Sequence, residues 1–232
     1  MIPCEAGAEL STMIANISSP LEVSPITEIH EQSITGFVLA GGASRRMGRD
    51  KGNLVLAGKS FVEHIIAALS PIVGSISVVG REFKGPGLRI PSIPDVYENW
   101  GALGGLHAAL QACQSPWAAV VACDLPFVTT DLFRCLASRR QDYDAVAPIQ
   151  RDGVPQPLCA LYRREACLVR AEQLIDSGER RPVALLQSVG TCWVQFAELA
   201  DLEGSQKFFD NINTPEDYEN VSEKGGVIRR RD

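Results

Sequence analysis

The sequence lacks a long apolar run, since no stretch approaches the roughly 18 apolar residues that a membrane-spanning helix needs. Its first residues, MIPCEAGAEL, lack the basic segment that opens a secretory signal. Histidine is scarce, with three residues, and the seven cysteines form no C-x-x-C pair, so the usual zinc spacings cannot be assembled. An odd number of scattered cysteines predicts free thiols in a reducing compartment. We therefore expect a cytoplasmic protein.

An excess of positive charge is also missing. The formal net charge is -6, so the molecule as a whole repels nucleic acid and anionic membranes, and we expect neither as a partner. Hydrophobic residues make up 45% and charged residues 22% of the 232 residues, which are ordinary values for a globular protein with one core.

The composition divides the chain into three parts. Residues 1–32 are rich in Ser, Pro, Thr and Glu and show no sustained period, which predicts a flexible extension, or a start codon placed too early. Residues 33–222 alternate short apolar runs with segments of helical period, which predicts a single α/β domain. The tail, 223–232, is expected to be frayed, with solvated arginines.

The periodicity locates the elements of this domain. The expected strands are Ile34–Leu39, Ser75–Val79, Leu88–Ile93, Ala118–Ala122, Ala145–Pro148, Leu158–Tyr162 and Thr191–Gln195. The expected helices are Phe61–Leu69, Leu103–Ala112, Thr130–Ser138, Arg164–Asp176, Val183–Leu186 and Thr214–Val221. The last helix opens with NTPEDYE, in which Thr214 is suited to be the N-cap.

A glycine-rich basic loop, GGASRRMGRDK, follows the first expected strand. It does not match the dinucleotide fingerprint G-x-G-x-x-G, because its glycines run G-G-x5-G. Gly58-Lys59-Ser60 imitates the end of a phosphate-binding P-loop. The earlier glycine of that motif would fall at position 53, which is Asn53, so the spacing fails.

The loop nevertheless suits a small anion. Gly41 and Gly42 let the backbone approach a ligand closely, and open α/β sheets bind ligands at the carboxyl ends of their strands. The positive charge that can neutralise phosphate oxygens comes from Arg45, Arg46, Arg49 and Lys51. The alternative is a basic surface loop with turn glycines.

A carboxylate ends the apolar strand AAVVACDLPFV. Asp124 is well placed for Mg²⁺, which takes one or two carboxylates together with phosphate oxygens, although it could equally cap the next turn. Near the end of the chain, Asp210, Asn211 and Asn213 precede the last helix as further metal or substrate contacts, or as caps.

The motifs together resemble a known family. LAGGASRRMGRDK fits L-A-G-G-x-S-x-R-M-G-x-D-K, and CDLPFV, GERRP and NINTPEDY follow it. From about Ile34 to Tyr218 the chain resembles the molybdenum cofactor guanylyltransferases, within the glycosyltransferase-A-like nucleotidyltransferases. The resemblance implies a three-layer α/β/α Rossmann-like sandwich with a mostly parallel, mixed sheet, and a magnesium-dependent transfer of GMP from GTP to molybdenum-bearing molybdopterin. Molybdoenzymes or their chaperones would then receive the product.

The resemblance also implies roles for individual residues. Catalysis would rest on Arg46, Lys51 and Asp124, with Asp124 also the metal ligand. The nucleotide would be bound by Leu39, Ala40, Gly41, Gly42, Ser44, Lys51, Asp95, Gly104 and Asp124. Asp95 would accept from the guanine N1–H and N2–H₂, or contact the ribose. The pterin candidates are Gln156, Pro157, Arg180, Arg181, Asn211 and Asn213.

Two departures from the family pattern bear on these roles. Gly80 stands where the family often has an asparagine, so that Arg81 would have to supply the contact. The loop GALGG, Gly101 to Gly105, keeps the glycines of the family's Gly-Pro-Leu-Ala-Gly and loses its proline. His107 lies on an expected amphipathic helix and is interpreted as structural rather than as a base.

Other functions remain open on the sequence alone. A cytidylyltransferase acting on the same cofactor, or a sugar- or polyol-phosphate nucleotidyltransferase, would keep the fold and the mechanism. LAGG resembles the guanylyl branch, whereas LAAG is more typical of the cytidylyl and sugar relatives. The alternative from another class is a non-catalytic nucleotide-binding adaptor that hands over the cofactor.

Overall fold

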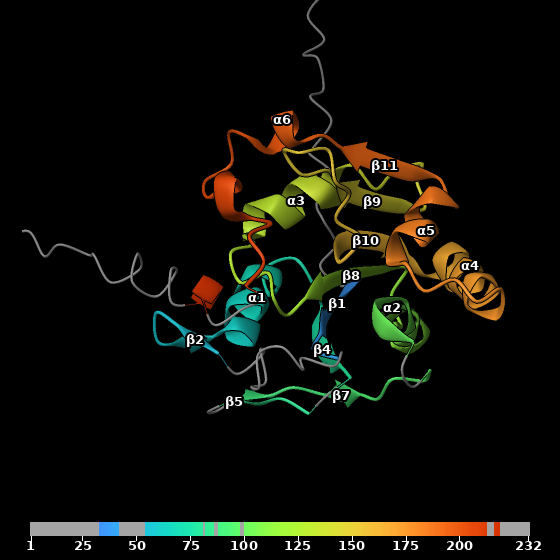
Figure 1. The fold of residues 1–232 in the computed structure, drawn as a ribbon, viewed down its shortest axis with the longest axis horizontal. Helices are drawn as coiled ribbons and strands as arrows, with labels where there is room; N and C mark the ends of the chain where they lie inside the picture. Colours follow the sequence, from blue (N-terminus) through green and yellow to red (C-terminus); the bar gives the residue numbers. More distant parts are fainter. Residues whose placement is uncertain are drawn as a thin grey trace, which may run out of the picture.

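The computed structural model describes residues 33–41, 54–80, 82–85, 88–97, 100–212 and 216–218. Their centre is a seven-stranded sheet in the order β11-β9-β10-β8-β1-β4-β7 (Figure 1). Its strands are β1 (Ile34–Leu39), β4 (Ser75–Val79), β7 (Ser92–Ile93), β8 (Trp117–Ala122), β9 (Ala145–Pro148), β10 (Cys159–Arg163) and β11 (Thr191–Val194).

The sheet is mixed, and one strand causes the mixing. β1 pairs in parallel with β4 and β8, β7 with β4, and β11 with β9. β10 is antiparallel to both of its neighbours, β8 and β9. The other six strands therefore all point the same way, and their carboxyl ends lie at one edge of the sheet.

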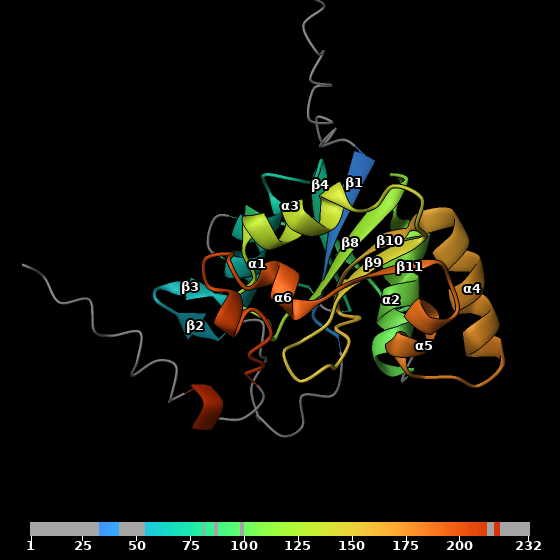
Figure 2. The same ribbon diagram turned by 90° about the horizontal axis from the view of Figure 1, so that it is seen from above.

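Helices cover both faces of the sheet, as Figures 1 and 2 show from two directions. One face carries α1 (Phe61–Leu69) and α3 (Thr130–Ser138), and the other carries α2 (Gly101–Ala112), α4 (Arg164–Asp176) and α5 (Pro182–Gln187). Each layer has its own apolar core, and β1 and β8 are buried throughout. Burial on both faces explains why these strands are nearly continuous apolar runs without alternation, in which Thr35 is the one polar residue. The expected α/β three-layer fold is confirmed.

The segment Gly58-Lys59-Ser60, whose sequence resembles the end of a P-loop, is part of a β-hairpin. β2 (Val55–Leu56) pairs antiparallel with β3 (Lys59–Ser60), and both turn residues, Ala57 and Gly58, have positive φ. Two positive φ values are typical of the tight hairpin turn that matches strand twist. Ser60 then caps α1 in a reciprocal capping box with Glu63. The Gly-Lys-Ser sequence therefore forms a turn and a helix cap, which agrees with the prediction that it is not a P-loop.

Most expected elements agree with the structure within two residues. The single strand expected at Leu88–Ile93 is wrong, because the structure divides it into β6 (Leu88–Arg89), which pairs with β5 (Lys84–Gly85), and β7. Pro91 lies between the halves and has no N–H for a ladder. The sequence reading also missed the short helix α6 (Phe196–Leu199) and a 3₁₀ turn, Ser205–Lys207.

Some expectations fall on residues that the structure does not describe. They concern the extension 1–32, the tail 223–232 and Thr214 as a cap, while residues 216–218 are helical. None of the helices in the described part of the chain combines the length and apolar character needed to cross a membrane. No disulfide bond joins the cysteines in the described part of the chain, namely Cys113, Cys123, Cys135, Cys159, Cys167 and Cys192.

Candidate active site

The site begins where the central strands end. The ladder between β1 and its neighbours extends one residue past the strands, since the Ala40 N–H donates to the Val79 oxygen (2.9 Å) and the Cys123 N–H donates to the Leu39 oxygen (3.0 Å). These bonds hold the segments after β1, β4 and β8 side by side at the carboxyl edge of the sheet. This edge is where open α/β sheets bind their ligands.

Three glycines form a close wall around Asp95. A Cβ on Gly41 would lie 3.1 Å from Asp95 Oδ2, and one on Gly105 would lie 3.6 Å from Oδ1. Gly80 has a φ of +96°, and a Cβ there would lie only 2.6 Å from Gly41 Cα. The segments after β1 and β4 therefore approach so closely that position 80 takes no side chain without a shift. Glycine at position 80 therefore permits the close approach of the two segments in this chain.

Asp95 carries a carboxylate whose hydrogen bonding is incomplete. Its Oδ1 is buried and finds no hydrogen-bond partner among the described residues. Burial raises the pKa of this carboxyl above its ordinary value. An ionised group that is partly withdrawn from water without a donor is costly unless a ligand supplies one. Asp95 is therefore a described group at this edge of the sheet that is prepared to receive the N–H or O–H donors of a ligand.

Asp124 lies two residues after the end of β8 at Ala122, close to a strand end as expected for a ligand. Its backbone oxygen accepts a hydrogen bond from the Ile212 N–H at 3.2 Å, which attaches the segment of Asn211 to the end of β8. The described residues contain no group of three or more His, Cys, Asp or Glu that could hold a metal ion. Mg²⁺ needs only one or two protein carboxylates when phosphates supply further oxygens, so the single carboxylate of Asp124 fits this ion.

The GERRP loop, residues 178–182, packs against Trp100 at the start of α2. The indole Nε1–H donates to the Glu179 oxygen at 3.1 Å, and the Arg180 guanidinium lies 4.7 Å from the centre of the indole ring. Arg181 forms a 2.7 Å ion pair with Glu179. This side-chain bond, helped by the backbone N–H groups of Arg181 and Arg180, lowers the pKa of Glu179 to about 2. Trp100 thus holds Arg180 and Glu179 holds Arg181, the two arginines expected to contact pterin.

Gly104 and Gly105 have different surroundings. A Cβ on Gly104 would lie 2.9 Å from Trp100 Cβ and 3.3 Å from the Tyr97 oxygen, so this glycine lets the helix start pack closely. Gly105 faces Asp95 instead. From the sequence, Gly104 was predicted to contact the nucleotide, whereas the contact of Gly105 with Asp95 and that of Trp100 with the GERRP loop were missed. The run of glycines in GALGG was a signal, but it did not show which glycine faces which neighbour.

The acceptor candidates lie further along the same edge. Gln156 is buried, and its N–H donates to the Pro148 oxygen at 2.9 Å, while the Pro157 oxygen accepts from the Tyr162 hydroxyl. Asn211 is exposed beside the end of β8. The remaining expected contacts lie outside the described residues, namely Gly42, Ser44, Arg45, Arg46, Arg49, Lys51, Arg81 and Asn213.

His107 is enclosed between α2 and α4. Its side chain is 2% exposed, its ring meets that of Tyr97 edge-on at 4.9 Å, and its Nε2 lies 3.6 Å from Glu172 Oε1. A side chain this enclosed has no path to a substrate phosphate. Its position agrees with the structural interpretation.

The family model described as a MobA-like NTP transferase domain matches residues 36–191, from β1 to the start of β11. The chain belongs to this family. As a MobA-like NTP transferase, it is a nucleotidyltransferase enzyme.

Individual relatives agree with the assignment. A probable molybdenum cofactor guanylyltransferase from Carboxydothermus hydrogenoformans is 30% identical over 82% of this chain and 95% of its own. The crystal structure of molybdopterin-guanine dinucleotide biosynthesis protein A from Archaeoglobus fulgidus superposes with a TM-score of 0.68 at 27% identity, covering 82% of this MobA-like chain and 97% of its own. A 4-diphosphocytidyl-2C-methyl-D-erythritol synthase from Anaerococcus prevotii shares only the fold, with a TM-score of 0.61 at 15% identity over 84% of this chain and 97% of its own.

Proposed function

We propose that this protein transfers GMP from GTP to the terminal phosphate of molybdenum-bearing molybdopterin and releases pyrophosphate. The names of the relatives support the reaction, and one observation carries the choice of base. Asp95 presents a carboxylate with a buried oxygen that has no hydrogen-bond partner among the described residues and that lies close to Gly41 and Gly105. Guanine offers two adjacent donors, N1–H and N2–H₂, which match a carboxylate fork. Cytosine offers one amino donor beside acceptor atoms, which a carboxylate repels.

The glycine wall also bears on the cytidylyl alternative. In an LAAG sequence, position 41 is alanine, and a Cβ there would lie 3.1 Å from Asp95 Oδ2. This distance is tighter than ordinary contact, so Asp95 would have to move. Gly41 therefore keeps the carboxylate where it lies, which favours the guanylyl reaction. A single methyl near a base is worth a modest discrimination of about 1–3 kcal/mol, so the nucleotide must be tested directly.

The reaction needs no covalent enzyme intermediate. The acceptor phosphate attacks the α-phosphorus of GTP in line, and a phosphate near neutral pH needs little deprotonation. Lys51 and Arg46 are proposed to contact the phosphates and Asp124 to hold the metal. When bound there, Mg²⁺ supplies positive charge to the departing pyrophosphate. The rate then comes mainly from positioning and electrostatic stabilisation.

The acceptor is proposed to lie on the side of the crevice away from Asp95. Arg180 and Arg181 approach from the GERRP loop, where Trp100 and Glu179 fix their positions. Gln156, Pro157, Asn211 and Asn213 complete the proposed pterin contacts. A cytoplasmic location and transfer of the product to molybdoenzymes or their chaperones remain predictions.

The test is pyrophosphate release with Mg²⁺ and molybdenum-loaded molybdopterin, comparing GTP, CTP, ATP and ITP. We expect release with GTP, a guanine dinucleotide product, and a higher KM for ITP, which lacks the 2-amino group. Equal KM values for GTP and ITP would indicate that Asp95 contacts the ribose and not the base. A preference for CTP would assign the cytidylyl reaction, and tight GTP binding without turnover would favour the adaptor.

A further inference from the structure

The acceptor turn, which runs from Gln156 to Leu158, carries two of the proposed acceptor contacts, Gln156 and Pro157. Its backbone is attached to both strands that flank β10. The Gln156 N–H donates to the Pro148 oxygen at the end of β9 (2.9 Å). The Ala122 N–H at the end of β8 donates to the Leu158 oxygen (2.8 Å). These two bonds fix the ends of the turn at the carboxyl edge of the sheet.

A third attachment comes from a side chain of the core. Tyr162 of β10 is fully buried, and its hydroxyl donates to the Pro157 oxygen. The Cys159 N–H donates to the Gln156 oxygen at 3.2 Å, which closes a tight turn. The chain thus folds back on itself, so that Pro157 meets a tyrosine five residues further along. Burial raises the pKa of this hydroxyl well above its ordinary value, so it stays protonated and acts as a donor.

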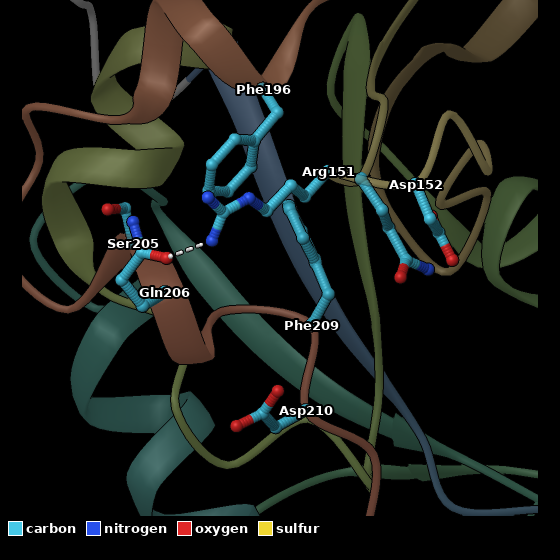
Figure 3. A pocket seen from close by; sticks show the side chains of 8 residues that line it. Arg151, Asp152, Phe196, Ser205, Gln206, Phe209 and Asp210 are labelled. Carbon is cyan, nitrogen blue, oxygen red and sulfur yellow. Dashed lines mark hydrogen bonds between the residues drawn. The ribbon is translucent and has the colours of Figure 1, made fainter.

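The tip of the loop between β9 and β10 is held separately. Arg151 at this tip lines a pocket of about 240 Å³ together with Phe196 and Asp210 (Figure 3). Its guanidinium donates to Gln206 Oε1 at 3.2 Å, the bond drawn in the figure. This contact ties the tip to the 3₁₀ turn and leaves the acceptor turn out. The place of the acceptor turn therefore depends on its own three attachments.

Gln156 is the side chain in this turn that is prepared for a ligand. Its side chain is 9% exposed, and its amide makes no hydrogen bond to the residues that the structure describes. A buried amide without a partner is costly, and a ligand that offers a matching donor and acceptor removes this cost. The amide has one acceptor oxygen and one donor nitrogen, so its use to a ligand depends on how the backbone beneath it is held.

We propose that Tyr162 is a positioning residue for the acceptor, because its hydroxyl fixes the acceptor turn and thereby holds the Gln156 amide in place. Tyr162 is fully buried, so it acts through the turn and not by contact with a substrate. The inference rests on the proposed function, since it takes Gln156 as a contact of molybdopterin. Asp95 lies on another segment, between β7 and α2, so GTP binding should not depend on this hydroxyl.

The experiment compares wild type with Tyr162→Phe, which removes the hydroxyl and keeps the buried ring. Tyr143→Phe is the matched control, because Tyr143 is 39% exposed and its hydroxyl makes no hydrogen bond to the described residues. Pyrophosphate release gives KM for the acceptor and for GTP, and fluorescence titration measures binding of molybdenum-loaded molybdopterin alone. Loss of folded enzyme lowers the rate but leaves KM unchanged, so KM separates positioning from stability. Both tyrosine variants are also made in a Gln156→Ala background.

We expect Tyr162→Phe to raise KM for the acceptor about fivefold, the effect of one neutral hydrogen bond, and to weaken acceptor binding similarly. KM for GTP should stay unchanged, and Tyr143→Phe should match wild type. In the Gln156→Ala background, Tyr162→Phe should raise KM no further, because the group through which it acts is gone.

Three results overturn the positioning role while wild type still turns over. They are an unchanged KM for the acceptor in Tyr162→Phe, a rise of equal size in the Gln156→Ala background, and a Tyr162→Phe protein that does not fold. If wild type shows no turnover but binds molybdopterin more tightly than Tyr162→Phe does, the proposed function fails and the positioning role stands. If wild type shows neither turnover nor binding, both fail.

Discussion

Gly80→Ala tests the close approach of the segments after β1 and β4 beside Asp95. Two separate effects act against a side chain at this position. The backbone has a φ of +96°, which L-residues rarely adopt, and a new Cβ would lie 2.6 Å from Gly41 Cα and 2.8 Å from Gly41 N. Both contacts are with backbone atoms, which cannot rotate away. The substitution should therefore move the segments after β1 and β4 apart and displace Asp95.

The two effects have different sizes and can be separated. Backbone strain at such a φ costs about 1–3 kcal/mol, and overpacking against a rigid neighbour costs typically about 1–3 kcal/mol more. Gly58 is the matched control, because its φ is +82° but a Cβ there meets nothing within 4 Å. Gly58→Ala therefore carries only the strain. We expect Gly80→Ala to lower the free energy of unfolding by about 2 kcal/mol more than Gly58→Ala.

Thermal unfolding is the assay. For a protein of this size, each kcal/mol shifts the midpoint by about 2–4 °C, so Gly80→Ala should unfold about 4–8 °C below Gly58→Ala. KM for GTP should rise in Gly80→Ala and stay unchanged in Gly58→Ala. Equal midpoints for the two variants would refute the close contact between Gly80 and Gly41. A lower midpoint with an unchanged KM for GTP would separate the contact from nucleotide binding.

Three further predictions concern chemistry, charge and burial. Lys51→Ala and Asp124→Ala should each reduce turnover by about two orders of magnitude or more, the size of a lost electrostatic stabiliser, with unchanged circular dichroism; near-wild-type turnover in either would contradict its role. Asp95→Asn should raise the thermal midpoint near neutral pH and also raise KM for GTP. Because burial holds the pKa of Asp95 in the folded protein above the ordinary 3.8, the wild-type protein loses stability as pH rises and Asp95 ionises. The gain in midpoint from Asp95→Asn should therefore vanish in acid, below pH 3.8, where the carboxyl is protonated in both the folded and the unfolded protein. A lower midpoint near neutral pH would show that the carboxylate is satisfied in the free protein. Burial raises the pKa of the Cys167 thiol to about 12, so a thiol reagent at mildly alkaline pH should modify Cys167 only after denaturation, as peptide mapping would show. Modification of the native protein at Cys167 would contradict its burial.

The sequence by itself determined most of the helices and strands of the main sheet, and the fold class. The short apolar runs at Ile34–Leu39 and Ala118–Ala122 predicted strands, and the structure buries both strands throughout. The bounds of α1, α3 and α4 agreed with the predicted bounds, since helical period and capping residues are local signals. Asp124 was predicted correctly at the end of a strand. Such features depend on neighbours within a few residues of the chain.

Only the tertiary structure decided how distant residues meet. The wall of Gly41, Gly80 and Gly105 around Asp95 joins four segments, and no local pattern shows that a Cβ at Gly80 would strike Gly41. The docking of GERRP on Trp100 likewise joins residues 79 positions apart. The pocket lined by Arg151, Phe196 and Asp210 also joins three segments that are separated in the sequence. These contacts depend on strand order, which the local pattern of residues does not encode.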